Sequence, residues 1–352
     1  MKKSERRDFV KKTITASLGL GLMGGLHNIY GKTTNESKGK RIGMVGLDTG
    51  HSVSFTELLN DDSAGDKYGG YKVVAAYPKG TDLIETWKNK IPQFTEEIRK
   101  KGVEIVNSVE QLLEKVDVVL ITSIDGNKHL EQALPVLKAG KPLFIDKPLA
   151  ASLSDAYAIV GAAKHYNTSM FSSSSLRYIG GVREIAEGKV GKVLGADVYS
   201  PAHLEEHHPD LFWYGVHGVE ILYTIMGTGC TNVMRTFTQG TDFVVGQWEN
   251  DRIGTYRGIR NGEGGYGGTV FGDKAITTLG EYKGNSPLLV KMTEFYRTGS
   301  IPVSHEETLE IFAFMQAAEE SKKIGGKSVS IKSVKQRAIE SANKWMQQNL
   351  KP

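Results

Sequence analysis

The sequence predicts an α/β fold for its first part and an α+β fold for its second part. Between residues 41 and 150, short apolar segments alternate with segments of helical character. After Pro148, short strand-like segments follow one another with glycine turns between them, and helical segments close the chain. The alternation indicates a doubly wound parallel sheet, and the later pattern indicates an open, mainly antiparallel sheet covered by helices.

Strands of the first sheet are expected where apolar runs are bounded by turn residues. These runs cover residues 41–47, 71–77, 102–108, 116–123 and 142–148. The run VDVVLITS at 116–123 is almost continuously apolar, which is typical of a parallel strand buried on both faces. Helices are expected between the runs, at 54–60, 81–101, 108–115 and 127–140.

A glycine turn, GLDTGH at 46–51, joins the first strand to the first helix, where a dinucleotide-binding fold places its phosphate loop. Gly46 would form the tight turn, but Asp48 and His51 stand where further glycines are expected. Thr49, the amide of Gly50 and the ring of His51 could donate hydrogen bonds to a phosphate. We place Asp48 in the same site and expect it to brace the turn.

The end of the second strand leaves the choice between NAD and NADP open. An acidic residue often stands there and binds the ribose hydroxyls, but this chain has Tyr77 in that place. Lys79 could meet a ribose phosphate, and Asp82 could still reach a ribose.

The second part begins with helices and strands in a different order. We expect helices at 152–166, 304–323 and 332–349, strands within 168–178, 231–239, 243–250 and 254–261, and a helix, turn and strand over 181–202. The predicted domains are a leader at 1–40, a Rossmann-type dinucleotide-binding domain at 41–150, a substrate and oligomerisation domain at 151–330 and a C-terminal helix at 331–352.

The leader carries an arginine pair, Arg6 and Arg7, followed by Phe9 and a mildly apolar, glycine-rich run. This order resembles a twin-arginine export signal, which a receptor reads. It predicts a protein exported to the periplasm that has the twin-arginine machinery as a partner. The alternative is a disordered basic terminus.

The charge and cysteine content exclude several classes of protein. The chain has a net charge of +4, but the first 40 residues hold nine Lys and Arg against three Asp and Glu. The rest of the chain is therefore slightly acidic and has no nucleic-acid footprint. A single cysteine, Cys230, excludes an intramolecular disulfide and a cysteine-cluster metal site.

Several stretches in order resemble the Gfo/Idh/MocA oxidoreductase family over about residues 40–330. They are RIGMVGLD, VDVVLITS, HLEQALPVLKAGKPLFIDKPLA, SLRYIGGVREIAEGKVGKVLGADV, WYGVHGVEIL and the late stretch that begins PLLVKMTEFYRTGSIPVSHEE. The resemblance implies a nicotinamide cofactor, a carbohydrate or polyol substrate, and assembly as a homo-oligomer. Export would favour a tightly bound NAD or NADP.

The resemblance implies two catalytic residues. DKP at 146–148 matches the family's Glu-Lys-Pro motif, which places Lys147 beside the nicotinamide and the substrate hydroxyl, where it would stabilise an alkoxide. His217 takes the place of the catalytic histidine and would act as acid and base. Glu220 could orient its ring. Many relatives have an aspartate four residues before this histidine, where this chain has Trp213.

The remaining site residues also follow from the resemblance. The further cofactor residues are Ser123, Asp125, His129 and Asp146, and the further substrate residues are Arg177, Tyr178, Asp210, Trp213 and Tyr214. The stretch HLEEH at 203–207 has a spacing used for zinc on helices. Pro201 and the preceding strand favour a loop there, so we predict no metal at His203, Glu206 and His207 and expect surface or substrate-contact residues. A metal site at these three residues is the alternative.

Together these features predict an exported NAD(P)-dependent oxidoreductase that transfers a hydride between a sugar or polyol hydroxyl and its cofactor. One alternative is an NAD-dependent glycoside hydrolase that oxidises its substrate transiently. A second alternative is a non-catalytic carbohydrate-binding or partner-binding protein on the same fold, which the departures at Asp48, Asp146 and Trp213 leave open.

Overall fold

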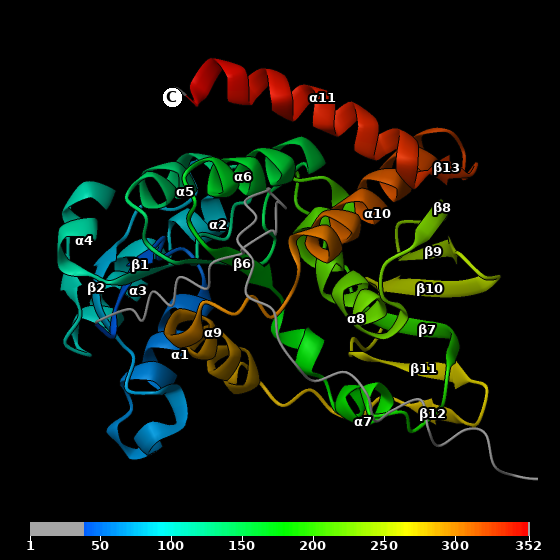
Figure 1. The fold of residues 1–352 in the computed structure, drawn as a ribbon, viewed down its shortest axis with the longest axis horizontal. Coiled ribbons are helices and arrows are strands. Elements are labelled where there is room, and N and C mark those ends of the chain that lie inside the picture. Colours follow the sequence, from blue (N-terminus) through cyan, green and yellow to red (C-terminus); the bar gives the residue numbers. More distant parts are fainter. Residues whose placement is uncertain (1–38, 351–352) are drawn as a thin grey trace, which may run out of the picture. The chain divides into compact units, whose positions relative to one another are not determined.

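The computed structural model describes residues 39–350, so the predicted export signal lies outside the described residues. The first sheet has six parallel strands, which confirms the predicted doubly wound fold (Figure 1). In spatial order they are β3 (Glu104–Ile105), β2 (Lys72–Tyr77), β1 (Arg41–Val45), β4 (Val118–Ile121), β5 (Leu143–Asp146) and β6 (Met170–Ser173). The strand order reverses between β1 and β4, and ligands bind at such a switch point.

Helices between these strands lie close to their predicted positions. They are α1 (Gly50–Asn60), α2 (Glu85–Lys88), α3 (Ile91–Arg99), α4 (Val109–Lys115), α5 (His129–Lys138) and α6 (Leu153–His165), with a 3₁₀ segment, η1, at Asp62–Tyr68. The single helix expected at 81–101 is two helices. Pro92 stands in the first turn of α3, where a proline is tolerated because its missing N–H would have no partner there.

The strand at 168–178 belongs to a different sheet from the one we expected. We placed it at the start of the second domain, but β6 pairs in parallel with β5 and forms the edge of the first sheet. The local sequence indicates a strand but not the neighbour it pairs with. The first sheet therefore continues past residue 150.

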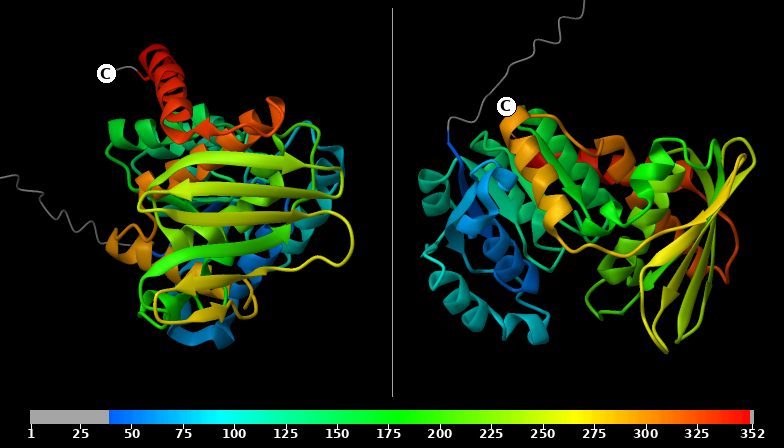
Figure 2. Two further views of the ribbon diagram at one scale, coloured as in Figure 1. Left: turned by 90° about the vertical axis from the view of Figure 1, so that its right-hand side faces the viewer. Right: turned by 90° about the horizontal axis from the view of Figure 1, so that it is seen from below.

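The second sheet is open and mainly antiparallel, as predicted. In spatial order its strands are β12 (Ile276–Thr278), β11 (Gly267–Gly272), β7 (Val193–Pro201), β10 (Arg252–Ile259), β9 (Thr241–Trp248), β8 (Cys230–Phe237) and β13 (Val329–Ser330), and only β7 and β10 pair in parallel. Two helices, α8 (Val216–Met226) and α10 (His305–Lys323), cover one face. Figure 2 shows no described element over the other face.

Three further helices complete the described chain. A short helix, α7 (Val182–Ala186), precedes β7, and α11 (Ile331–Asn349) packs against α6 and α10. A third helix, α9 (Ser286–Thr298), was not predicted, and it packs its apolar face on the first sheet. The Tyr296 hydroxyl of α9 donates to the carbonyl of Val119 in β4 at 2.7 Å. Between residues 39 and 350, no helix combines the length and apolar character needed to cross a membrane.

Candidate active site

The glycine turn lies at the switch point of the first sheet and packs tightly against the loop after β4. Gly46 has a φ of 84°, and a Cβ added there would lie 2.0 Å from the hydroxyl oxygen of Ser123. Only glycine avoids both the left-handed strain and this collision. The Ser123 hydroxyl is buried, and no hydrogen-bond partner for it occurs among the described residues. It is therefore a polar group available to a ligand.

Asp48 braces the turn, as we expected. Its carboxylate is fully buried and accepts hydrogen bonds from the backbone N–H of Thr81 at 2.5 Å and of Ile124 at 3.0 Å. A Cβ on Gly80 would lie 2.1 Å from Asp48 Oδ2, so Gly80 leaves the room that the carboxylate occupies. Burial raises the pKa of Asp48, and the two amide bonds oppose that shift. The side chain thus ties together the loops after β1, β2 and β4.

His51 joins the glycine turn to the loop that carries Lys147. Its Nδ1–H donates to Asp146 Oδ2 at 2.6 Å, and its ring stacks on Phe55. Asp146 is 3% exposed, and its second oxygen, Oδ1, is buried without a partner among the described residues. Thr49 caps α1 by accepting from the His51 backbone N–H at 3.3 Å. The residues predicted as phosphate donors therefore also hold the turn in place.

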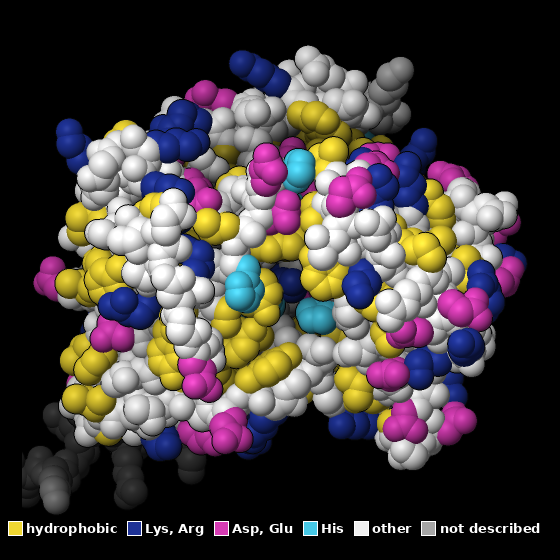
Figure 3. Space-filling model, turned by 180° about the vertical axis from the view of Figure 1, so that it is seen from behind, with side chains coloured by type: hydrophobic (Ala, Val, Ile, Leu, Met, Phe, Trp, Pro, Cys, Tyr) yellow, Lys and Arg dark blue, Asp and Glu magenta, His cyan; other side chains and the backbone are white. Residues whose placement is uncertain are grey.

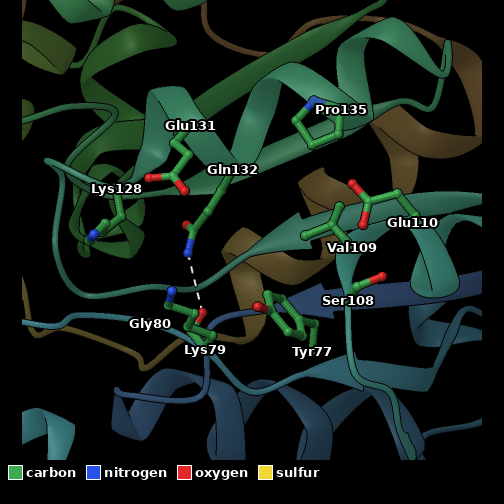
Figure 4. Close-up of a pocket in the computed structure, with 10 residues that line it drawn as sticks. All are labelled: Tyr77, Lys79, Gly80, Ser108, Val109, Glu110, Lys128, Glu131, Gln132 and Pro135. Atoms are coloured by element: carbon green, nitrogen blue, oxygen red, sulfur yellow. Dashed lines mark hydrogen bonds between the residues drawn. The ribbon is translucent and has the colours of Figure 1, made fainter.

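A pocket of about 360 Å³ opens at the carboxyl ends of β2 and β3 (Figure 4). Tyr77 and Lys79, both predicted cofactor residues, line it together with the first turns of α4 and α5. Gln132 Nε2 donates to the Lys79 carbonyl at 3.3 Å, while Gln132 Oε1 is buried without a described partner. Asp82 does not contribute a free carboxylate, because it pairs with Lys128 at 2.6 Å.

Asp125 and His129 hold loops together beside the turn. Asp125 is fully buried, accepts from the Thr81 hydroxyl at 2.9 Å, and lies 3.0 Å from Nε2 of His208. The two ring nitrogens of His129 lie 2.7 and 2.8 Å from the carbonyl oxygens of Ser123 and Pro148. These contacts assign both predicted cofactor residues a role in shaping the site.

The charge of Lys147 reaches the buried ring of His217. Burial lowers the pKa of His217 well below 6.5, and the charges of Lys147 and His51 lower it further. Burial also lowers the pKa of Lys147, against the opposing charge of Asp146. Figure 3 shows histidine and basic side chains inside a hollow bordered by hydrophobic side chains. The structure thus brings together the two predicted catalytic residues.

The partner of His217 is a serine rather than the glutamate that we expected. Ser174, just after β6, places its Oγ 2.7 Å from His217 Nδ1. Glu220 instead accepts from Ser173 at 2.9 Å and from Arg177 Nε at 2.8 Å. The spacing of three residues on one helix predicted that Glu220 would contact His217. The Glu220 carboxylate binds the charged Arg177 instead. No local signal distinguished Ser174 within its run of serines.

Two predicted substrate residues are held in ion pairs. Arg177 binds Glu220 at 2.8 Å and Glu307 at 2.6 Å, and Asp210 binds Arg235 and Lys322, both at 2.6 Å. Tyr178 is half-buried, and burial raises the pKa of its hydroxyl to about 12. The charges of Arg177 and Asp210 therefore serve the protein's own packing.

An aromatic wall surrounds His217 and includes residues that the sequence analysis did not identify. Trp213 and Tyr214 belong to a π-helical turn, η3 (Leu211–Gly215), and the Tyr214 ring lies 4.9 Å from the His217 ring. The hydroxyls of Tyr214 and Tyr266 are 3.0 Å apart, and the Tyr266 and Tyr282 rings are 5.8 Å apart. Tyr266 and Tyr282 follow glycine-rich stretches that carry no recognisable motif, so only the fold identifies them.

The stretch at 203–207 lies in a loop, as predicted. His207 is exposed and contacts Glu205 at 3.1 Å, and the His203 ring lies 4.9 Å from the Tyr214 ring. No group of three His, Cys, Asp or Glu side chains that could hold a metal ion occurs in residues 39–350.

Residues 40–173 match the GFO_IDH_MocA model, described as an oxidoreductase family with an NAD-binding Rossmann fold. The 1,5-anhydro-D-fructose reductase of Ensifer adhaerens is 35% identical over 107 residues, which are 29% of this chain and 32% of the reductase. Inositol 2-dehydrogenase 3 of Saccharopolyspora erythraea is 34% identical over 87 residues, 24% of each chain. The chain thus matches about a third or less of these two relatives.

Solved structures share the fold over most of the chain. The structure of scyllo-inositol dehydrogenase from Lactobacillus casei with bound NAD(H) and scyllo-inositol has a TM-score of 0.65 at 15% identity, and the match covers 84% of this chain and all of that one. GenD2 from gentamicin A biosynthesis, in complex with NAD, has a TM-score of 0.66 at 15% identity, with 82% and 95% covered. At these identities, the likeness shows a common fold.

Proposed function

We propose that this chain, whose residues 40–173 match the GFO_IDH_MocA oxidoreductase model, oxidises or reduces a sugar or polyol with NAD or NADP. The observation that carries this proposal is a pair of contacts: His51 Nδ1 of the glycine turn lies 2.6 Å from Asp146 Oδ2, next to Lys147, and His217 Nδ1 lies 2.7 Å from Ser174 Oγ at the end of the same sheet. The relatives that resemble it include reductases and dehydrogenases of anhydrofructose and inositol.

The residues at the switch point fit a dinucleotide. Ser123 Oγ and Gln132 Oε1 are buried polar atoms without described partners. Gln132 lines the pocket, and Ser123 Oγ lies beside Gly46 of the glycine turn. A Cβ on Gly50, at the start of α1, would meet no atom within 4 Å, so the helix N-terminus is open to a phosphate. The pocket beside Tyr77 and Lys79 would take the adenosine end.

Lys147 and the aromatic wall suit a substrate with several hydroxyls. The chemistry that a bound nicotinamide supplies is hydride transfer to or from the substrate carbon. Lys147 would stabilise negative charge on the reacting oxygen. Tyr214, Tyr266 and Tyr282 offer hydroxyls for hydrogen bonds and flat rings that suit the apolar face of a sugar.

Export and assembly are further parts of this proposal. The Arg6–Arg7 pair and the apolar run after it support twin-arginine export. A cofactor that leaves the cytoplasm with the folded protein would have to stay bound and be recycled in the site. The uncovered face of the second sheet exposes apolar side chains such as Ile253 and Leu194, which supports a homo-oligomer.

The test is a mass spectrum of the ligand released when the full-length protein, purified from its native compartment, is denatured. We expect NAD or NADP in the spectrum, or saturable binding of one of them when it is added. Lys147→Ala should lower turnover of the oxidised or reduced sugar by about 100-fold or more while dinucleotide binding persists. Protein that carries no nicotinamide and gains none on incubation would contradict the proposal.

A further inference from the structure

The two nitrogens of the His217 ring have different surroundings. Nδ1 lies 2.7 Å from the hydroxyl oxygen of Ser174, and no partner for Nε2 occurs among residues 39–350. The Ser174 side chain is fully buried and also accepts a hydrogen bond from the backbone N–H of Leu176 at 3.1 Å. Ser174 is therefore bonded on two sides, and Nε2 is the nitrogen that remains for a ligand.

The number of hydrogens on Ser174 determines which nitrogen of His217 carries the proton. A serine hydroxyl has one hydrogen to donate and two lone pairs that accept. One lone pair of Ser174 is used by the Leu176 N–H, and in the described chain the only acceptor in reach of the hydroxyl hydrogen is His217 Nδ1. If Nδ1 carried the proton instead, the hydroxyl hydrogen would be buried without an acceptor. The satisfied arrangement leaves Nδ1 bare and puts the proton on Nε2.

The charges around His217 disfavour its protonated form. Among the described residues no carboxylate pairs with the His217 ring, because position 213 is Trp213 and the carboxylate of Glu220 is occupied by Arg177 and Ser173. The other side chains that face the ring are Ser174, Tyr214 and Tyr266. Burial, with the charges of Lys147 and His51, therefore holds the pKa of His217 well below 6.5.

We propose that His217 acts as a neutral hydrogen-bond donor through Nε2–H, and that Lys147, not His217, carries the proton of the reaction. This proposal rests on the proposed function and assigns the roles within that site. Ser174 is then a positioning residue that fixes the tautomer. The pattern differs from a histidine base, which needs a bare nitrogen toward the substrate and a partner that stabilises the imidazolium.

In the oxidation direction, the substrate O–H bond breaks and its proton passes to the neutral amine of Lys147. A bound dinucleotide would take the hydrogen of the same carbon as hydride, together with the electron pair of the broken C–H bond, and the C=O bond would form. His217 donates Nε2–H to the oxygen throughout and keeps its proton. In the reverse direction, the Lys147 ammonium returns the proton. Burial lowers the pKa of Lys147, so the neutral amine is more accessible than in an exposed lysine.

The replacement of His217 by glutamine separates the two roles. Glutamine can place an amide N–H near the position of Nε2–H, but it cannot accept and carry a proton. We expect His217→Gln to keep turnover within about tenfold of the wild type, and His217→Ala to lose about 100-fold or more. His207→Gln, an exposed histidine of the neighbouring loop, is the control. Equal losses in His217→Gln and His217→Ala, with both folded, would overturn the proposed donor role.

An independent test reads the tautomer in the wild-type protein. Long-range ¹H–¹⁵N correlation spectra of the full chain with ¹⁵N-labelled histidine should show His217 as the Nε2–H tautomer, neutral at pH 6, and Ser174→Ala should alter that signal. An Nδ1–H tautomer or an imidazolium would overturn the proposal.

Fluorescence titration with NAD and NADP on the same sample tests the proposed function separately. Without dinucleotide binding, both the function and the proton roles fail, even if the tautomer is as expected.

Discussion

The imidazole of His51 and the carboxylate of Asp146 lie 2.6 Å apart, from Nδ1 to Oδ2, and connect the glycine turn to the loop of Lys147. Both residues depart from the patterns that the sequence resembles, one from a glycine and the other from a glutamate. The two departures therefore form one contact.

This contact predicts a strong coupling between the two positions. Asp146→Glu alone should push the longer side chain against the His51 ring, and His51→Ala alone should leave a buried carboxylate unpaired. Each should weaken dinucleotide binding, whereas the double variant should recover part of the loss, with a coupling of about 0.5–3 kcal/mol. Fluorescence titration of the four proteins measures this. Additive effects would show that the pair is not a unit.

Asp48 gives a second prediction, on stability and on the cofactor. Removal of the carboxylate leaves the buried N–H groups of Thr81 and Ile124 without acceptors. Asp48→Ala should therefore lower the free energy of unfolding by about 1–3 kcal/mol, and Asp48→Gly should weaken dinucleotide binding because the turn loses its brace. Denaturant unfolding of each variant, with the exposed Asp66→Ala as control, measures the first effect. Tighter binding by Asp48→Gly would mean that Asp48 intrudes on the phosphates.

Hydrophobic periodicity predicted the two sheets and most helices, because it is a local signal. The pairing of Lys147 with His217 in one site came from the family resemblance instead. The sequence did not predict the contacts of charged side chains. For Arg177 and Asp210, the local sequence does not distinguish a side chain that binds a ligand from one that forms an internal ion pair. Likewise, Ser174 reaches His217 only because β6 is the edge of the first sheet, and strand pairing depends on residues distant in the sequence.

The burial of His217 predicts how stability depends on pH. Folding holds the pKa of His217 well below 6.5. On acidification, His217 of the unfolded chain therefore binds a proton near pH 6.5, whereas His217 of the folded protein stays neutral at that pH. The contribution of His217 to the free energy of unfolding should thus fall as the pH drops below about 6.5. His217→Gln should flatten that part of the curve relative to the wild type, and the control His207→Gln should not. Unfolding in denaturant between pH 5 and 8 measures this.

Lys79 predicts which dinucleotide binds more tightly. The end of β2 has Tyr77 in place of a carboxylate, and Asp82 is paired with Lys128, so no free acidic group of this loop repels a ribose phosphate. We expect NADP to bind more tightly than NAD, and Lys79→Ala to reduce NADP affinity by about tenfold with little effect on NAD. Lys138→Ala, on the exposed end of α5, is the control. Equal effects on the two dinucleotides would exclude a phosphate contact at Lys79.

Arg235 predicts the largest loss of stability. This side chain is 1% exposed and binds Asp210 at 2.6 Å, Asp242 at 2.7 Å and Glu319 at 2.9 Å. Glu319 also accepts from the backbone N–H of Leu211, the first residue of the π-helical turn before His217. Without Arg235, Asp242 keeps Arg260 and Asp210 keeps Lys322, but Glu319 loses its ion-pair partner among the described residues. Because a buried charge is then left unpaired, Arg235→Leu should lower the free energy of unfolding by about 3–5 kcal/mol.

The matched control for Arg235 is Arg183→Leu, which breaks an exposed pair with Glu187 of the same helical neighbourhood. Such pairs contribute about 0–1 kcal/mol, so this variant should unfold close to the wild type. Arg235 also anchors the turn that carries Trp213 and Tyr214. At temperatures where the variant is still folded, Arg235→Leu should therefore weaken substrate binding. Its dinucleotide affinity should not fall to the same extent. If Arg235→Leu were as stable as Arg183→Leu, the ion pairs of Arg235 would make no net electrostatic contribution to the free energy of unfolding.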